Sequence, residues 1–156
     1  MKYIFYFALL IIFLSLGTEQ KVFAQKSLQA AVNQYTIKQA KNQDATAVGK
    51  KTTLGDIDGD GDKDAVLEYT LEGFGGGNNW TQLLAVFLNQ KGVYKFADEA
   101  TVGGKFFTYT STLSGISKGA IKLETEICDE PPQGICENPT KGTATFTFTN
   151  GKLSEK

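Results

Sequence analysis

From residue 64 onward, apolar and polar side chains alternate with a period of two, and this alternation constrains the fold more than any other feature. Between Ala65 and Leu71, for example, every second residue is apolar and most of those between are polar. Side chains of a strand point alternately to the two faces of a sheet, so the pattern predicts strands with one buried face. Glycine-containing turns separate consecutive strands, which predicts an antiparallel meander.

The segment 80–89 differs from the other predicted strands because it is apolar on both faces. Such a strand is central and is covered on both sides. A helix predicted over 27–41 is the natural cover, since Leu28, Val32 and Tyr35 follow helical spacing and Ser27 can cap its start. The predicted fold class is therefore α+β and mostly β, an antiparallel meander sheet with one N-terminal helix packed on it.

The first 24 residues have the composition of a secretory signal peptide. Lys2 precedes an apolar run that is too short for a comfortable membrane span, and small residues stand at the −3 and −1 positions of a cleavage site after Ala24. An uncleaved N-terminal anchor is the alternative. We predict that residues 1–24 are the signal peptide and that residues 25–156 form a single β-rich domain, secreted or periplasmic, with no membrane contact after cleavage.

The charged residues exclude several classes of function. The chain has 16 lysines and 17 acidic residues, and neither arginine nor histidine occurs in it. Histidine is the commonest general base and arginine the usual reader of guanine and phosphate, so we expect neither an enzyme nor a nucleic-acid partner. Glu124 and Glu126 could form a carboxylate pair, but their alternation with apolar residues is explained better by a solvated strand face.

The two cysteines, Cys128 and Cys136, are even in number and close in sequence. In an exported protein this parity predicts a disulfide between them. Prolines and a glycine already bend the nine-residue loop that the bridge would close. Two free thiols are the alternative, and the spacing does not favour a metal or redox role.

The segment "GDIDGDGDKD" places an aspartate at every second position: Asp56, Asp58, Asp60, Asp62 and Asp64. Two unit charges about 5 Å apart repel by roughly 1 kcal/mol even in water, so a folded loop gains from a cation among them. Ca²⁺ takes six to eight oxygen ligands, which alternate side chains of a tight loop can supply. Gly61 permits the bend that such a loop needs. The segment therefore predicts a Ca²⁺ site; an acidic turn without metal is the alternative.

An EF-hand would need a bidentate glutamate at position 12 of the loop, where this chain has Leu67. The pattern D-x-D-x-D-G-x-x-D before an apolar strand instead resembles the calcium-binding β-hairpin loop of FG-GAP and VCBS-type repeats. The resemblance covers about 15 residues and a single copy, whereas those families usually carry several. It implies side-chain ligands from Asp56, Asp58, Asp60 and Asp64, and a backbone carbonyl ligand from Asp62.

A glycine-rich stretch, "EGFGGGNNW", is most simply a hairpin turn, but Phe74 and Trp80 beside it could contact a ligand. We therefore expect an exported, non-catalytic Ca²⁺-binding domain whose calcium is structural and which binds an unknown protein or glycan. A small secreted hydrolase or a hydrolase inhibitor is the alternative function. Converging carboxylates in a cleft would favour the enzyme, and an exposed aromatic surface near Trp80 would favour the binding module.

Overall fold

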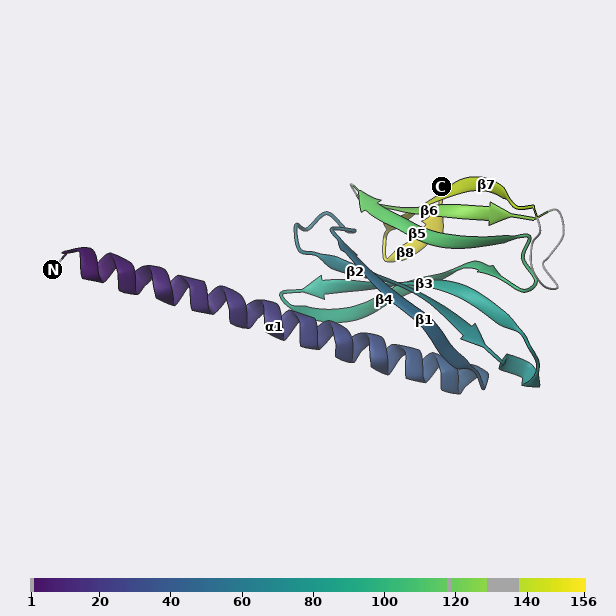
Figure 1. The fold of residues 1–156 in the computed structure, drawn as a ribbon, viewed down its shortest axis with the longest axis horizontal. Helices are drawn as coiled ribbons and strands as arrows, with labels where there is room; N and C mark the ends of the chain where they lie inside the picture. The colour runs from purple at the N-terminus through teal and green to yellow at the C-terminus, as the bar shows by residue number, and fades with distance from the viewer. Residues whose placement is uncertain (1, 118, 129–137) are drawn as a thin grey trace.

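The computed structural model describes residues 2–117, 119–128 and 138–156, with backbone only for residues 2–20. One long helix precedes two four-stranded antiparallel sheets, each with its strands in sequence order (Figure 1). The first sheet is followed by the second through a short connection after residue 104. The elements are α1 (Lys2–Gln43), β1 (Thr46–Gly55), β2 (Asp64–Glu72), the 3-10 turn η1 (Phe74–Gly76), β3 (Trp80–Gln90), β4 (Val93–Gly104), β5 (Tyr109–Ser117), β6 (Ala120–Ile127), β7 (Thr140–Thr149) and β8 (Lys152–Glu155).

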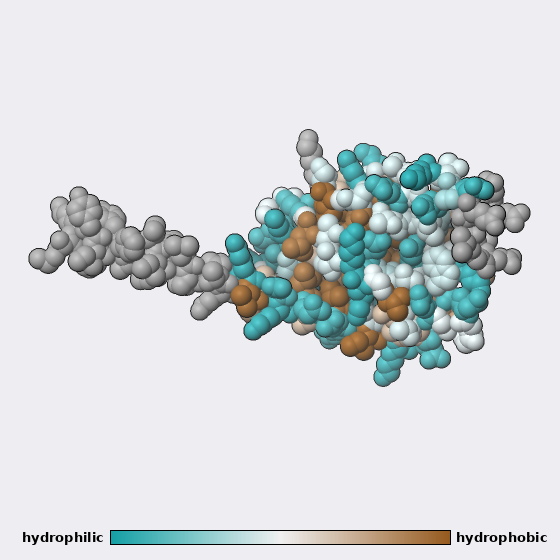
Figure 2. All heavy atoms as spheres, in the orientation of Figure 1, coloured by the Kyte–Doolittle hydropathy of each residue, from teal (hydrophilic) through white to brown (hydrophobic). Residues whose placement is uncertain are grey.

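The two sheets lie face to face, and α1 covers the outer face of the first sheet, which gives three layers (Figure 1). The predicted α+β fold, an antiparallel meander with one helix packed on it, is confirmed. The sequence pattern did not indicate that the meander divides into two sheets. Hydrophilic residues cover most of the face in Figure 2, and apolar residues appear there as separate patches.

Strand β3 is the centre of the molecule, as its two apolar faces predict. Ala85 and Phe87 belong to the core under α1, whereas Leu84 and Val86 belong to the core between the sheets. All four are fully buried. At about 25 cal/mol per Å² of apolar surface removed from water, a strand buried on both faces contributes more than any strand buried on one.

Helix α1 begins much earlier than the predicted start at Ser27, since it runs without interruption from Lys2. Residues 2–26 contain no proline and one glycine, so nothing in the sequence stops the helix before Ser27. The Ser27 side chain is therefore not a cap; its Oγ accepts a hydrogen bond from the backbone N–H of Tyr94, 3.1 Å away. In the described part of the chain, we find no helix with the length and apolar character needed to span a membrane.

A partly buried polar cluster joins α1 to the first sheet. The Glu99 carboxylate on β4 accepts hydrogen bonds from the Tyr35 hydroxyl of α1, at 2.6 Å, and from the Tyr69 hydroxyl of β2, at 2.7 Å. The Tyr35 ring also stacks on Phe96, with the ring centroids 4.3 Å apart. Burial, followed by the nearby Glu99 carboxylate, raises the pKa of both hydroxyls above the ordinary tyrosine value.

The raised pKa values make the protein sensitive to alkali. Below about pH 10 both hydroxyls are protonated whether the chain is folded or unfolded. Above that pH the unfolded chain loses these protons and the folded chain keeps them, so the free energy of unfolding should fall by up to about 1.4 kcal/mol per pH unit for each tyrosine. Urea unfolding between pH 8 and about pH 11.5 measures this slope.

The substitutions Tyr35→Phe and Tyr69→Phe separate this effect from the titration of lysines. In each variant, the free energy of unfolding should fall less steeply with pH above pH 10, because one titrating tyrosine is gone. Near neutral pH, each variant should be less stable by about 1 kcal/mol, because one hydrogen bond is lost. A slope above pH 10 that is the same in both variants and in the unmodified protein would show that the cluster does not cause the alkaline loss.

Candidate metal centre

The aspartate loop connects β1 to β2 as a hairpin. Gly55 at the end of β1 pairs with Asp64 at the start of β2, so the loop between them spans residues 56–63. Gly59 and Gly61 have φ angles of 85° and 90°, which glycine adopts without the steric cost that a side chain brings. These two residues let the chain turn tightly enough for aspartates from both ends of the loop to meet.

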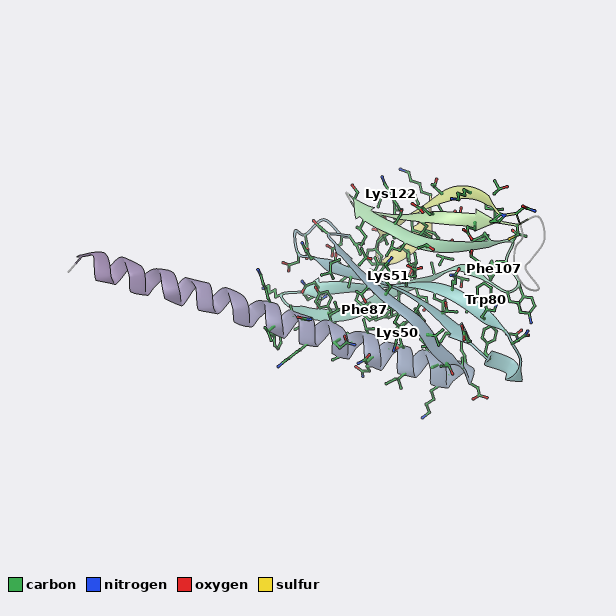
Figure 3. All side chains as sticks on the ribbon, in the orientation of Figure 1. Lys50, Lys51, Trp80, Phe87, Phe107 and Lys122 are labelled. Carbon is green, nitrogen blue, oxygen red and sulfur yellow. The ribbon has the colours of Figure 1, made fainter. Side chains whose placement is uncertain are left out.

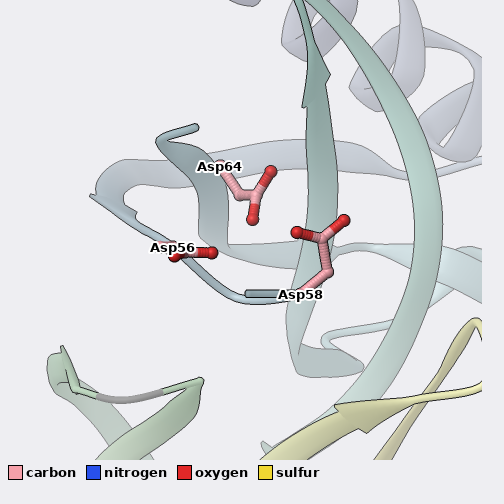
Figure 4. A group of neighbouring side chains, drawn as sticks. All are labelled: Asp56, Asp58 and Asp64. Carbon is pink, nitrogen blue, oxygen red and sulfur yellow. The ribbon is translucent and has the colours of Figure 1, made fainter. Parts of the chain in front are cut away.

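Three of the predicted ligands are brought together: Asp56, Asp58 and Asp64 (Figure 4). One carboxylate oxygen from each lies within 4.8 Å of the others. Two ligands of one Ca²⁺ ion, each at 2.3–2.6 Å, can be separated by at most about 5 Å. The three oxygens therefore have a separation that a single cation can bridge, and carboxylates are the ligand type that hard cations prefer.

Asp64 is the best fixed of the three and is completely buried. Its Oδ2 accepts a hydrogen bond from the Ile57 N–H and its Oδ1 one from the Asn89 N–H, both at 2.8 Å. Burial raises the pKa of this carboxyl, the two backbone hydrogen bonds lower it, and the neighbouring Asp58 charge raises it further. The net shift is upward, because the effect of burial is the largest of these.

The other two predicted ligands, Asp60 and Asp62, lie exposed at the tip of the turn and are not part of this group. The Asp60 Oδ1 accepts a hydrogen bond from the Asp62 N–H at 2.8 Å, which holds the turn itself. Asp56 acts in the same way, accepting from the N–H groups of Gly59 and Gly61 at 2.8 and 3.2 Å. The structure thus divides the five aspartates into a converging group of three and an outer pair.

Two residues that support the loop had no signal in the sequence. The Asn89 side chain and the Tyr94 hydroxyl both donate to the Lys63 carbonyl, at 3.2 and 2.8 Å. Both residues are more than 25 positions from Lys63, so only the pairing of β2, β3 and β4 brings them to the loop. They fix the backbone immediately before Asp64.

The loop also packs against the second sheet. Asp56 and Asp58 line a cavity of about 510 Å³ together with Ile116 and Gly119 of the β5–β6 region and with the end of β7. The approach is close: a Cβ atom added to Gly119 would lie 3.2 Å from the Ile57 carbonyl oxygen. The candidate metal centre is therefore situated where the two sheets meet.

Gly55 offers a direct test of this contact. A Cβ atom on Gly55 would lie 2.6 Å from Cγ2 and 2.7 Å from Cβ of Ile116, so Gly55→Ala should lower the free energy of unfolding by about 1–3 kcal/mol through overpacking. Gly115→Ala is the matched control, because a Cβ there meets nothing within 4 Å. Thermal unfolding measures both; equal stability of the two variants would contradict the packing of the hairpin on β5.

The predicted ligand-contact aromatics are near one another in sequence but do not share a cavity. Trp80 lines a cavity of about 530 Å³ with Glu72, Asn78 and Asn79 among others, and Phe74 is not among its lining residues. Phe74 belongs to η1, where its carbonyl accepts a hydrogen bond from the Asn79 side chain at 3.2 Å. Trp80 lies at the start of β3, at the same end of the molecule as Phe107 (Figure 3).

Of the two cysteines predicted to form a disulfide, only Cys128 lies within the described part of the chain. Cys128 follows β6, its N–H donates to the Thr108 carbonyl at 2.7 Å, and its sulfur is disulfide-bonded. Cys136 lies outside the described residues. The pairing of Cys128 with Cys136 stays a prediction, for which mass spectrometry of the non-reduced, exported protein is the measurement.

Comparisons of the chain with protein-family models, with curated proteins and with solved structures found no match. The function therefore has to be inferred from the fold and from the site itself. What these define is a β-rich domain with a hairpin loop whose converging carboxylates could hold one cation.

Proposed function

We propose that this protein is an exported, non-catalytic domain that binds one Ca²⁺ ion in the 56–64 hairpin, where the ion has a structural role. The observation that carries the proposal is the convergence of Asp56, Asp58 and Asp64 within 4.8 Å. Their resemblance to the FG-GAP and VCBS-type loop supports the same assignment, with Asp60 and the Asp62 carbonyl as further ligands that would close around the ion.

The donor set favours Ca²⁺ over Mg²⁺. Ca²⁺ accepts six to eight oxygens in flexible geometry, whereas Mg²⁺ requires a near-octahedral arrangement and keeps several waters. The loop offers many oxygens from an exposed, glycine-containing turn, which suits the larger ion. Soft ligands are absent from the loop, so a copper or structural zinc site is disfavoured.

The surroundings of the loop support a structural role for the ion. Asp64 is tied to both Ile57 and Asn89, so an ion held by Asp64 would connect the hairpin to β3. The loop also borders the second sheet. The only basic side chain in the loop is Lys63, which is exposed.

We propose that this domain, with its structural Ca²⁺ ion, functions by binding a protein or a glycan. The cavity beside Trp80 supports a glycan most directly, because it combines one aromatic ring with the amides of Asn78 and Asn79. Aromatic faces and hydrogen-bonding amides at a concave surface are typical of small-molecule binding sites.

Thermal unfolding of the exported protein tests the calcium site. A Ca²⁺ concentration one hundredfold above the Kd should stabilise the folded state by roughly 2.7 kcal/mol relative to EDTA, and Mg²⁺ should have a much smaller effect. Asp58→Asn should abolish the shift, because it removes a charge from the converging group. Asp60→Asn tests the resemblance: a reduced shift supports Asp60 as an additional ligand.

Asp44→Asn is the matched control, since Asp44 is an exposed aspartate outside the loop with a φ of 50° that asparagine tolerates. It should keep the full Ca²⁺ shift. If Ca²⁺ leaves the unfolding temperature of the unmodified protein unchanged, or if Mg²⁺ matches Ca²⁺, the proposed site is wrong.

A further inference from the structure

A second groove lies between α1 and the first sheet, next to the aspartate loop. It has a volume of about 790 Å³, within the range of sites that hold small organic ligands. The helix contributes residues from Lys21 to Asn33, β1 contributes alternate residues from Lys50 to Leu54, and Lys63, Asn89 and Tyr94 complete the lining.

The position of β1 explains why this groove has an apolar floor. Leu54 pairs with Ala65 and Thr52 with Leu67, and both partners belong to the core under α1. Directly paired residues share a face of the sheet, so Leu54 is on the helix side as well. Nevertheless Leu54 is 48% exposed, which shows that α1 does not cover this part of β1. Leu28, Val32 and Tyr94 line the groove beside it.

The charged residues that line the groove all have one sign, whereas carboxylates of the aspartate loop lie just outside it, near Tyr94. Lys21, Lys50 and Lys63 line it, and no aspartate or glutamate does. None of these lysines forms a salt bridge with the described residues, among which Lys152–Asp98 is the ion pair observed. Figure 3 shows Lys50 on β1, the strand that borders the groove. An apolar floor bordered by unpaired ammonium groups is complementary to a ligand with an apolar chain and a negative charge.

We propose that this groove binds a single-chain amphiphile with a carboxylate head group. The alkyl chain would lie against Leu28, Val32 and Leu54, and the carboxylate would be held near Lys50 and Lys63. Cleavage after Ala24 would remove two lining residues, Lys21 and Ala24, and would keep the residues that the proposal uses. The inference does not depend on the proposed calcium function.

Isothermal titration calorimetry of the exported protein with sodium octanoate, below its micellar concentration and with Ca²⁺ present, tests the proposal. Octanoate should bind saturably at one site. Acetate, which has the head group alone, and octyltrimethylammonium, which has the chain with the opposite charge, should not bind. Lys50→Gln and Lys63→Gln should each weaken octanoate binding about fivefold, the effect of one unit charge at contact distance in water.

Lys141→Gln, the same change at an exposed position of β7 in the second sheet, is the matched control and should bind octanoate like the unmodified protein. Leu54→Ser should weaken binding through the chain alone, and its half-exposed position lets the fold survive. Lys50→Gln, a change on β1 outside the aspartate loop, should also keep the full Ca²⁺ shift in unfolding temperature, so that failure of the groove and failure of the calcium site remain distinguishable.

Three results would overturn the proposal. These are the absence of saturable octanoate binding, equal binding of octyltrimethylammonium, and a loss of affinity in Lys141→Gln as large as that in Lys50→Gln. If the first result came together with binding of a short acidic peptide, the groove would accept a different class of ligand.

Discussion

Replacing Asp64 with alanine should lower the free energy of unfolding by about 3 kcal/mol even in EDTA, where no calcium is bound. The substitution removes the acceptor for the Ile57 and Asn89 N–H groups, and each buried donor left unsatisfied costs about 1–3 kcal/mol. For a chain of this size the unfolding temperature should fall by roughly 10 °C. Differential scanning calorimetry in EDTA measures the change.

Asp58→Ala separates this structural role of Asp64 from metal binding. The Asp58 carboxylate is exposed, and its Oδ1 accepts one hydrogen bond, from the Asp60 N–H at 3.2 Å. In EDTA, Asp58→Ala should therefore change the stability by less than about 0.5 kcal/mol. With Ca²⁺ present, both variants should lack the calcium-dependent increment. Equal losses in EDTA would show that Asp64 is no more important to the fold than an exposed aspartate of the same loop.

The second large effect is expected at Phe87. Phe87 lies on β3 near α1 (Figure 3), where its side chain is fully buried. Its ring meets the Tyr35 ring edge-on at a centroid distance of 5.5 Å. Phe87→Ala should lower the free energy of unfolding by about 3–5 kcal/mol, through lost burial and the cavity it leaves. Urea unfolding followed by the fluorescence of Trp80, the one tryptophan of the chain, measures the loss.

Phe96→Ala is the matched control on β4. Phe96 also touches Tyr35, but it is 44% exposed, so its removal should cost about 1 kcal/mol. If the two phenylalanine variants are equally stable, the helix does not depend on the core under it, and the three-layer arrangement would be contradicted.

The sequence predicted those parts of the fold that depend on local pattern. The side chains that the alternation over β2 and the two apolar faces of β3 predicted to be buried are buried, but Val66, on the polar face of β2, is fully buried as well. These patterns could not indicate what buries the side chains: Leu84 and Val86 pack on the second sheet, and Ala85 and Phe87 pack on α1. A two-residue period gives the face of a strand but not its partner, because the partner is set by contacts distant in sequence.

The candidate site shows the same division. The spacing of the aspartates predicted a tight loop with convergent carboxylates, and Asp56, Asp58 and Asp64 do converge. The hydrogen bond from the Asn89 N–H to the Asp64 carboxylate could not be predicted, because it depends on the register of β2 against β3. The Tyr35, Tyr69 and Glu99 cluster was missed for a related reason, since its three members come from three separate elements.

The strand order of the two sheets has a consequence for how the chain folds. Every strand pairing joins neighbours in sequence, from β1 with β2 to β7 with β8. Each sheet can therefore grow by successive hairpins, which form in microseconds and need only short loops to close. Docking of the two sheets and of α1 is the step that requires distant segments to meet. We infer that the rate-limiting barrier to folding is this docking, at the surfaces on either side of β3.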